Sequence, residues 1–326
     1  MTKKIILWML AGVLLSATPF AQAQQPTKVP RIGRLGGGPL SASGIEVFRQ
    51  ALRELGYVEG KNIVIELRSA EENFDRLPAL AAELVRLKVD VIVTTSPTGT
   101  RAAKEATATI PIVMTNDSDP VGNGFVGSLA RPGGNITGLS TLAPELSGKR
   151  LELLKEIVPR LSRVAVFGTS RSPDNAQTLR EVETGAEAFK VKLQYLDVLG
   201  PKDIETAFRA ADKGRAEAIL MMVGRAIAGG HRTEIADLAV KSRLPAIYNR
   251  RADVEGGGLM SYGVYLPELD RRVANYVDKI LKGAKPADLP VEQPRKFEFI
   301  INVKTAKQIG LTIPPNVLAR ADRVIK

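Results

Sequence analysis

The chain has no cysteine and only one histidine, His231, among its 326 residues. Without cysteine it can form no disulfide, no thiolate nucleophile and no thiolate–metal bond. His231 follows Gly229-Gly230 at the start of a predicted helix, where a histidine usually caps the helix or faces solvent. No group of histidine, aspartate and glutamate residues has the spacing of a metal site. We therefore predict no metal, and no catalysis through a serine–histidine or cysteine–histidine pair.

The glycine signatures of nucleotide binding are also missing. The run Gly36-Gly37-Gly38-Pro39-Leu40-Ser41 lies between a predicted strand and a predicted helix, which is the right place for a dinucleotide fingerprint. Ser41 stands where the third glycine is required, however, and Pro39 interrupts the run. There is no Gly-Lys-Ser/Thr phosphate loop and no Gly-x-Ser-x-Gly elbow. The sequence thus predicts no cofactor and no enzyme.

Aromatic residues make up only 5% of the chain, and they do not interleave with basic residues. The formal net charge is +11, and part of it comes from Lys3 and Lys4 at the N-terminus. The other basic residues are scattered, whereas a nucleic-acid-binding surface concentrates them on one face. We expect a solvated basic surface and no nucleic-acid partner.

Only one hydrophobic run is long, and it lies at the N-terminus. Ile5 to Leu15 is almost wholly apolar, follows Lys3 and Lys4, and precedes Ala21-Gln22-Ala23, a small-x-small cleavage pattern. A membrane span needs roughly 20 apolar residues, so an N-terminal anchor helix is the weaker alternative. Residues 1–23 are therefore predicted to be a signal peptide that is cleaved after Ala23.

Export agrees with the absence of cysteine. A chain without thiols avoids unwanted disulfides in an oxidising compartment, and it has no cysteine to carry a lipid after the signal peptide. We expect a freely diffusing protein, which suits the closed periplasm of a Gram-negative bacterium. No later stretch reaches transmembrane length.

Beyond the N-terminus, β-branched apolar runs alternate with amphipathic stretches. Strands are predicted at 31–35, 62–67, 90–95 and 111–115, and helices at 45–55, 76–87 and from Pro97 onward. This alternation favours right-handed crossovers and a parallel sheet that is covered on both faces. The segment 117–139 is rich in glycine and proline and is predicted to be a loop, with one or two helical turns at 125–129.

The alternation then starts again, which predicts a second lobe of the same kind. Helices are expected at 149–158, 174–189, 201–211 and 232–242, and strands at 163–167, 192–198, 218–223 and 245–248. A last series of strand, helix, strand and helix follows at 259–262, 267–281, 296–303 and 304–309.

We interpret this last series as a return to the first lobe. The first lobe then comprises residues 29–140 plus 264–326, and the second lobe comprises residues 141–263. The prediction is an α/β fold in which two lobes with parallel sheets are joined by a hinge of several crossovers. Such a hinge has the geometry of domain closure around a ligand.

Polar residues follow the predicted strands of both lobes at their carboxyl ends. Ligands of open α/β sheets bind at these ends, where helix N-termini supply free N–H groups. The candidates for ligand binding are Gly37, Ser96, Pro97, Thr98, Asn116 and Asp117 in the first lobe, and Ser170, Arg171, Gly224, Arg225, Tyr248, Asn249 and Tyr262 in the second. A hinge could bring both sets around one small molecule.

The candidate residues suggest what the ligand carries. Ser96 and Thr98 stand at a predicted helix start and suit a carboxylate. Asp117 would pair with an ammonium group. Tyr248 and Tyr262 would stack on a ring or cover the cleft.

Two arginines, Arg225 and Arg250, would favour an anionic group if they pointed inward. Two interpretations stay open for them and for Arg251. Either they face the cleft, or they lie on its solvated rim.

Several segments resemble the signature of one family of ABC transporter substrate-binding proteins, which includes members that bind aromatic amino acids. The similar segments are 119–121, 129–138, 149–154, 257–263, 276–290 and 309–315, and they span the chain from about Arg31 to its end. The resemblance implies a type I periplasmic-binding fold with two Rossmann-like lobes, three crossovers, a cleft and no catalysis. It also implies a small-molecule ligand, ABC permease subunits as partners, and a monomer.

The chain departs from the family pattern in two places. The run 221–230 lacks the acidic and aromatic residues that are usual after this strand, and Ala252 stands where an acidic residue usually follows the arginine. Both departures fall on loops that should face the cleft in the second lobe. They favour an amino acid or an organic anion in general over a specifically aromatic amino acid.

Two other functions compete with solute binding for transport. A ligand-sensing periplasmic partner of a membrane receptor would need the same fold and the same export. A nucleotide-dependent enzyme on a Rossmann-like lobe would need a glycine fingerprint and a catalytic acid or base, and the sequence supplies neither.

Overall fold

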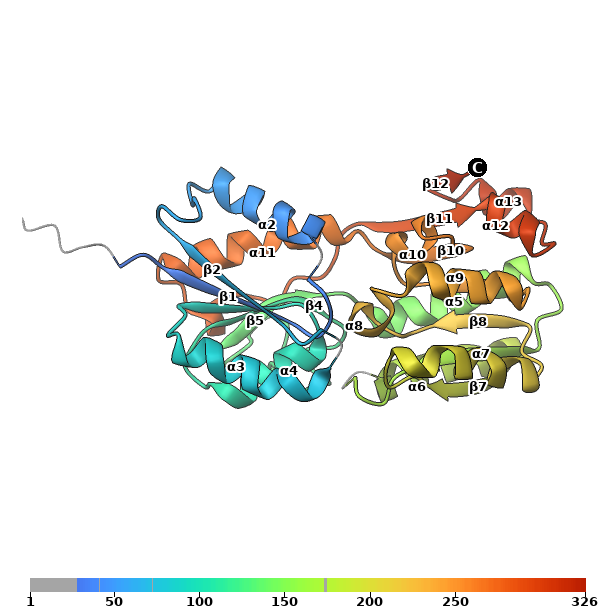
Figure 1. The fold of residues 1–326 in the computed structure, drawn as a ribbon, viewed down its shortest axis with the longest axis horizontal. Helices are drawn as coiled ribbons and strands as arrows, with labels where there is room; N and C mark the ends of the chain where they lie inside the picture. The colour runs from blue at the N-terminus through green and yellow to red at the C-terminus, as the bar shows by residue number, and fades with distance from the viewer. Residues whose placement is uncertain (1–27, 41, 72, 173–174) are drawn as a thin grey trace, which may run out of the picture.

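The computed structural model describes residues 28–326 except Ser41, Glu72, Pro173 and Asp174. The predicted signal peptide, residues 1–23 with cleavage after Ala23, lies outside the described residues. Of the helices in the described part of the chain, none combines the length and the apolarity needed to cross a bilayer. The described chain folds into two lobes, each built on its own sheet (Figure 1).

The first lobe contains a parallel sheet of five strands in the order β2-β1-β3-β4-β5. Its strands are β1 (Arg31–Gly36), β2 (Val64–Ser69), β3 (Val91–Thr94), β4 (Ile112–Asp117) and β5 (Ile136–Ser140). The helices of this lobe are α2 (Ala42–Glu54), α3 (Leu77–Arg86), α4 (Pro97–Ala106) and α11 (Leu266–Leu281), with the short 3-10 turns η1 (Phe74–Arg76) and η3 (Pro286–Asp288). Apolar side chains of α2 and α11 form a core on one face of the sheet. Those of α3 and α4 form a core on the other face.

The second lobe contains a sheet of seven strands in the order β12-β11-β10-β9-β8-β6-β7. Its strands are β6 (Arg163–Gly168), β7 (Lys192–Asp197), β8 (Ala218–Met221), β9 (Ala246–Tyr248), β10 (Met260–Val264), β11 (Phe297–Asn302) and β12 (Arg323–Ile325). Only the pair β10–β11 is antiparallel among these described strands.

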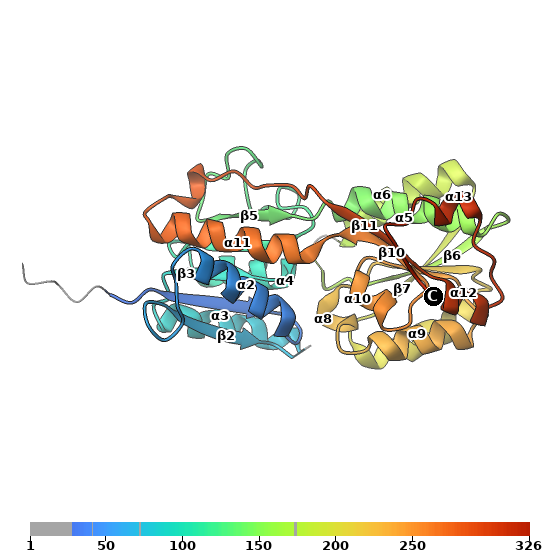
Figure 2. The ribbon, with the colours of Figure 1, turned by 90° about the horizontal axis from the view of Figure 1, so that it is seen from above.

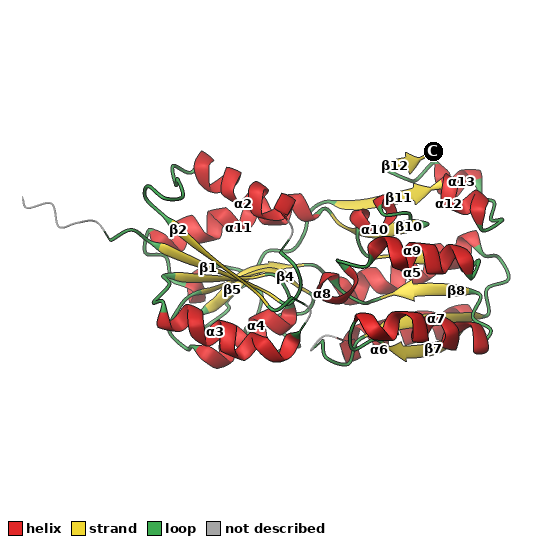
Figure 3. Cartoon of the chain, in the orientation of Figure 1, coloured by secondary structure: helices red, strands yellow, loops and turns green. Residues whose placement is uncertain are grey.

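Helices cover both faces of this second sheet, as Figure 3 shows by colour. One face carries α5 (Ala143–Ile157), α6 (Asn175–Phe189), α12 (Val303–Gln308) and α13 (Pro315–Leu318). The other face carries α7 (Ile204–Lys213), α8 (Arg225–Ala228) and α9 (Arg232–Lys241), while η2 (Pro201–Asp203) and α10 (Arg251–Glu255) lie in connections. Each lobe therefore has the two-faced core that the alternating sequence predicts.

Strand β5 lies inside the segment that was predicted to be a loop. The expected helical turn at 125–129 is absent from the assigned helices of the described chain, and those residues form irregular turns. Gly138, in the middle of β5, has a φ of +132°, and a side chain there would collide with the backbone of Met114 on β4. Glycine is thus required for β5 to pair with β4, although glycine in a sequence normally argues against a strand.

The last strands correct the predicted lobe boundaries. Residues 264–326 were assigned to the first lobe, but β11 and β12 extend the sheet of the second lobe. The reason is that β11 pairs with β10, and its Phe299 and Ile301 pack in the same core as Val164 and Val166 of β6. Only α11 and the segment up to about Glu292 pack on the first lobe (Figure 2).

The chain consequently crosses between the lobes three times. The first crossing joins β5 to α5, the second joins β10 to α11, and the third joins the segment after Glu292 to β11. The second and third crossings run side by side, since the Tyr265 backbone N–H donates to the Lys296 carbonyl at 3.1 Å. Three short connections in one place form a hinge with few degrees of freedom.

Helix α11 is tied to the first lobe by a buried ion pair. Arg34 on β1 is 2% exposed, and its Nη2 donates to Asp270 Oδ1 on α11 at 2.9 Å. The Arg34 guanidinium also lies 5.1 Å from the ring centroid of Phe48 on α2. A buried charge is tolerated only when it is paired, so this contact fixes where the returning helix docks.

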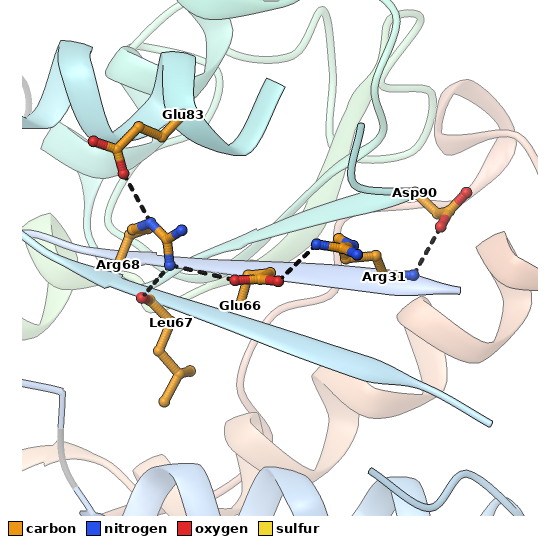
Figure 4. Close-up of polar contacts among 6 residues, drawn as sticks. All are labelled: Arg31, Glu66, Leu67, Arg68, Glu83 and Asp90. Atoms are coloured by element: carbon orange, nitrogen blue, oxygen red, sulfur yellow. Dashed lines mark hydrogen bonds and ion pairs between the residues drawn. The ribbon is translucent and has the colours of Figure 1, made fainter. Parts of the chain in front are cut away.

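The edge strand β2 is covered by charged side chains (Figure 4). Arg31 Nη1 donates to Glu66 Oε1 at 2.8 Å, and Arg68 Nε donates to Glu83 Oε2 on α3 at 2.9 Å. Asp90 Oδ2 accepts from the Arg31 backbone N–H at 2.7 Å. Charges on an edge strand oppose pairing with other chains.

Candidate functional site

A cavity of about 140 Å³ lies between the two lobes, next to the crossings. Both lobes contribute to its lining, with polar residues at strand ends and apolar residues from α5, α8 and η1. The lining residues are Gly37, Gly38, Phe74, Thr95, Ser96, Pro97, Thr98, Asn116, Ser118, Thr141, Ala143, Leu146, Ser147, Arg150, Thr169, Arg171, Ser172, Asn175, Thr178, Met222, Gly224, Ile227, Asn249, Arg250, Val264 and Leu266. A cavity of roughly 150 Å³ can hold a benzene-sized group.

The wall from the first lobe consists of strand ends and the start of α4. Gly37 follows β1, the run 95–98 leads from β3 into α4, and Asn116 is the last residue but one of β4. Ser96 caps α4: its Oγ accepts from the Gly99 N–H at 3.1 Å and lies 3.0 Å from Thr98 Oγ1. Pro97 begins the helix, where its fixed φ is favourable and its missing N–H is not needed. This wall offers hydroxyl groups and a helix N-terminus, and it carries no charged side chain among the described lining residues.

The wall from the second lobe comes from the loops after β6, β8 and β9. Asn175 at the start of α6 is held in place because its Oδ1 accepts from the Thr169 N–H at 3.2 Å and its Nδ2 donates to Tyr195 Oη at 3.0 Å. The side-chain oxygens of Thr169 and Thr178 and Asn249 Oδ1 are buried without a hydrogen-bond partner among the described residues. These oxygens are available to a ligand.

Three arginines belong to this wall, and they differ in their partners. Arg250 forms a buried bidentate pair with Asp253, with Nη2–Oδ1 at 2.6 Å and Nε–Oδ2 at 3.0 Å. Arg171 is exposed, and its guanidinium lies 6.0 Å from the ring centroid of Phe74 on the first lobe. Arg150 is 3% exposed and has no ion pair with any described carboxylate.

Arg150 projects from α5 toward the crossings. Its Nε donates to the Tyr262 carbonyl at 2.7 Å, and its Nη1 donates to Ser147 Oγ at 2.9 Å. Burial lowers the pKa of the Arg150 guanidinium to about 10, so the group is still charged at neutral pH. The cavity therefore contains a buried cation, and none of its described lining residues is an aspartate or a glutamate.

Asp117 does not line the cavity, although the sequence suggested that it would pair with an ammonium group. It is 0% exposed, and its Oδ1 accepts from the Asp119 N–H at 3.2 Å and from Asn123 Nδ2 at 3.0 Å. Its role is to hold the loop that follows β4. A carboxylate that is committed to its own loop is a capping group, as aspartate often is after a strand.

The side chains of three other candidates, Ser170, Tyr248 and Tyr262, do not line the cavity, and that of a fourth, Arg225, is not described. Ser170 turns outward to Asp197, with Oγ–Oδ2 at 2.6 Å. Tyr248 is 2% exposed within the core of the second lobe. Tyr262 packs on Phe297 and Phe299 and contacts the site through its backbone carbonyl. The side chain of Arg225 lies outside the described residues.

The cavity lining includes the other candidates, which are Gly37, Ser96, Pro97, Thr98, Asn116, Arg171, Gly224 and Asn249. Sequence reasoning missed Arg150, Asn175 and Phe74. Asn175 is the second residue of a predicted helix, and Phe74 stands in a polar run before one, so neither had a distinctive pattern. Arg150 had one: it shares a helical face with Leu146, Leu153 and Ile157, and a charged residue on an apolar face is unusual.

Comparison with known proteins places this geometry in context. A sequence profile of the family described as ABC transporter substrate binding protein matches residues 40–325. The tyrosine-binding protein of Clostridioides difficile (strain R20291) is 26% identical over 264 residues, covering 81% of this chain and 75% of that protein.

Two solved structures are similar over nearly the whole described chain. A conserved domain protein from Vibrio cholerae O1 biovar El Tor has a TM-score of 0.84 and 28% identity, covering 91% of this chain and 100% of that one. The ABC domain in complex with L-Trp from Streptococcus pneumoniae has a TM-score of 0.82 and 26% identity, covering 91% and 99%. They confirm the predicted α/β fold of two Rossmann-like lobes.

The family profile, the two lobes and the cavity between them agree with the resemblance noted in the sequence. The chain belongs to the family of ABC transporter substrate-binding proteins.

Proposed function

We propose that this protein is a periplasmic receptor that closes its two lobes around a small organic ligand, an amino acid or an organic anion, and delivers it to an importer. The observation that carries the proposal is the position of the cavity. It lies between the lobes beside three crossings, and both lobes line it. A ligand held there touches both lobes only when they are closed, so binding favours the closed state.

The relatives support this ligand class. One is named for tyrosine and another was solved with L-Trp, and both ligands carry a carboxylate and an aromatic ring. The cavity of this chain has the matching features of a buried cation, hydroxyl groups and an apolar side formed by Phe74, Leu146 and Ile227.

The partners follow from the family. We propose that the closed form docks on ABC permease subunits of the inner membrane, that the protein acts as a monomer, and that it catalyses no reaction. Delivery requires that the closed state be recognised. A ligand that favours closure by a few kcal/mol is sufficient to make that state dominant.

A ligand screen tests the proposal. Thermal unfolding of the mature protein is followed with amino acids, aromatic and aliphatic carboxylates, sugars and nucleotides. A ligand at about 100 times its Kd should stabilise the fold by about 2.7 kcal/mol, and small-angle X-ray scattering should show a smaller radius of gyration. If no compound causes either change, or if only nucleotides do, the proposal is wrong.

A matched pair of glycine substitutions locates the binding site. Gly224 lines the cavity and Gly134 is exposed on the first lobe, and neither has an atom within 4 Å of where a Cβ would stand. G224W should fill the cavity and abolish the ligand-dependent shift in thermal unfolding, whereas G134W should leave that shift unchanged.

Osmotic-shock fractionation tests the proposed periplasmic location. The protein released by the shock should begin at Gln24.

A further inference from the structure

We propose that Arg150 is the residue that binds the carboxylate of the ligand, and that the ligand class is therefore organic monocarboxylates, with or without an ammonium group. This inference rests on the proposed function, since it concerns the same cavity. It differs from the sequence-based expectation, which looked to Arg225 and Arg250 for the positive charge.

Arg150 is buried, and no described carboxylate neutralises its charge. The residue is 3% exposed, and among the described residues no carboxylate lies within ion-pair distance of its guanidinium. Its Nε and Nη1 donate to the Tyr262 carbonyl and to Ser147 Oγ, which are neutral, while Nη2 donates to no described residue. A buried cation without a counter-ion is unfavourable. A ligand carboxylate would supply that counter-ion and would be held by strong, charge-assisted hydrogen bonds.

The other buried arginines are neutralised within the protein. Arg250 also lines the cavity, but Asp253 holds it through two short hydrogen bonds. Arg34 is paired with Asp270, away from the cavity. Among the described residues, Arg150 is thus the one buried arginine of the cavity whose charge is left for a ligand.

The lining of the cavity offers no described carboxylate to an ammonium group of the ligand. No aspartate or glutamate is found among the described lining residues, and Asp117 is committed to its own loop. An ammonium group of the ligand would find neutral oxygens, such as Asn249 Oδ1 and Thr169 Oγ1, but no described carboxylate. We infer that the carboxylate is required for binding and that the ammonium group is not.

The position of Arg150 connects the ligand to the hinge. Tyr262, whose carbonyl it contacts, lies on β10 just before the second crossing, and Ser147 lies on α5 just after the first. A carboxylate bound to Nη2 would therefore be held beside two of the three crossings. Binding at this place would restrict the movement of both connections.

Calorimetric titration with a matched series tests the inference. One set consists of L-tyrosine, L-tyrosinamide and hydroxyphenylpropionate, which is tyrosine without its amino group. The other consists of L-tryptophan, L-tryptophanamide and indolepropionate. We expect each amide to bind about 100-fold more weakly than its acid, and the propionates to bind within about tenfold of the amino acids.

Substitution of Arg150 then separates charge recognition from a merely structural role. In R150Q the dissociation constant of each amide should be at most about three times that of its acid. R150K should restore part of the wild-type difference. A control variant, R101Q, alters an exposed arginine outside the cavity and should keep the full ratio. If R150Q does not fold, the wild-type ratio and R150K still decide the question.

Four results would contradict the inference. Equal binding of acid and amide to the wild type would overturn the role of Arg150 and leave the proposed function intact. Binding of neutral sugars alone in the wider screen would overturn both the role of Arg150 and the ligand class of the proposed function. An R150Q variant that loses affinity for acid and amide equally would show that Arg150 only supports the fold of the site. If no compound of any class binds, the proposed function itself fails, and the inference fails with it.

Discussion

Two buried arginines of this protein lie in contrasting surroundings. Arg34 in the first lobe is paired with Asp270 of α11, and that pair joins segments that are far apart in the sequence. Arg150, beside the cavity, donates to a carbonyl and a hydroxyl group and has no described carboxylate partner. The same type of side chain therefore serves the fold in one place and is left for a ligand in the other.

The two arginines differ in what neutralises their positive charge. Arginines that hold the architecture have their counter-charge within the chain, because losing the partner would leave an unpaired charge in an apolar interior. A binding site can leave its charge uncompensated, since the ligand completes it. Arg250 belongs with Arg34 in this respect, although it lines the cavity.

The largest expected effect comes from removing the partner of Arg34. D270N should lower the free energy of unfolding by about 3 kcal/mol, because it leaves Arg34 buried and unpaired. The control is E54Q. Glu54 on α2 is the exposed ion-pair partner of Arg271, which follows Asp270 on α11. Its replacement should change the free energy of unfolding by less than about 0.5 kcal/mol. Urea unfolding measures both, and similar values for the two variants would refute the distinction.

The second substitution, D253N, would leave Arg250 without its carboxylate partner, as Arg150 already is. D253N should lower the free energy of unfolding by about 2 kcal/mol, again because a buried charge loses its partner. It should also raise the affinity for a bound carboxylate by about threefold, since a second cation of the cavity is then unneutralised. Titration with indolepropionate checks this result, and a loss of affinity in a folded D253N would contradict it.

The third prediction concerns a contact between the lobes. Arg171 lies over Phe74 across the cleft, whereas Arg101 lies over Phe125 within the first lobe at 5.8 Å. R171A should weaken ligand binding about threefold, because the closed state loses a cation–π contact worth about 0.5–1 kcal/mol. R101A should leave the dissociation constant unchanged. The two constants are compared by calorimetry, and equal losses would show that closure does not depend on the Phe74 contact.

The smallest effect is expected for R150Q without ligand. The variant loses two hydrogen bonds worth about 1 kcal/mol each but also removes a buried cation that has no described counter-ion. These contributions oppose each other, so the free energy of unfolding should change by less than about 1 kcal/mol. Urea unfolding of the ligand-free protein tests this, and a loss as large as that of D270N would place Arg150 among the structural arginines.

The sequence predicted most of the fold because burial repeats regularly along it. Helices such as α2 and α11 have apolar residues at helical spacing, and strands such as β3 are continuous apolar runs. The sheet to which each strand belongs was harder to predict, because the apolar pattern of β11 does not indicate which of the two sheets it joins. Strand β5 was predicted to be a loop. Gly138 is needed there for close approach to β4, and glycine in a sequence normally indicates a loop.

The site was predictable only in part, for a related reason. Strand ends and helix starts can be found from periodicity, and residues such as Ser96 and Asn249 do line the cavity. The direction of a side chain after a strand cannot be found in this way. Asp117 turns into its own loop and Tyr248 into the core, while Arg150 comes from the apolar face of α5.

The most direct test is a crystal structure of the mature protein with the tightest-binding compound of the ligand screen. We predict that the compound lies between the lobes, with a carboxylate oxygen about 3 Å from Arg150 Nη2 and with Arg250 still paired to Asp253. A compound that binds elsewhere, or one that presents a neutral group to Arg150, would contradict it.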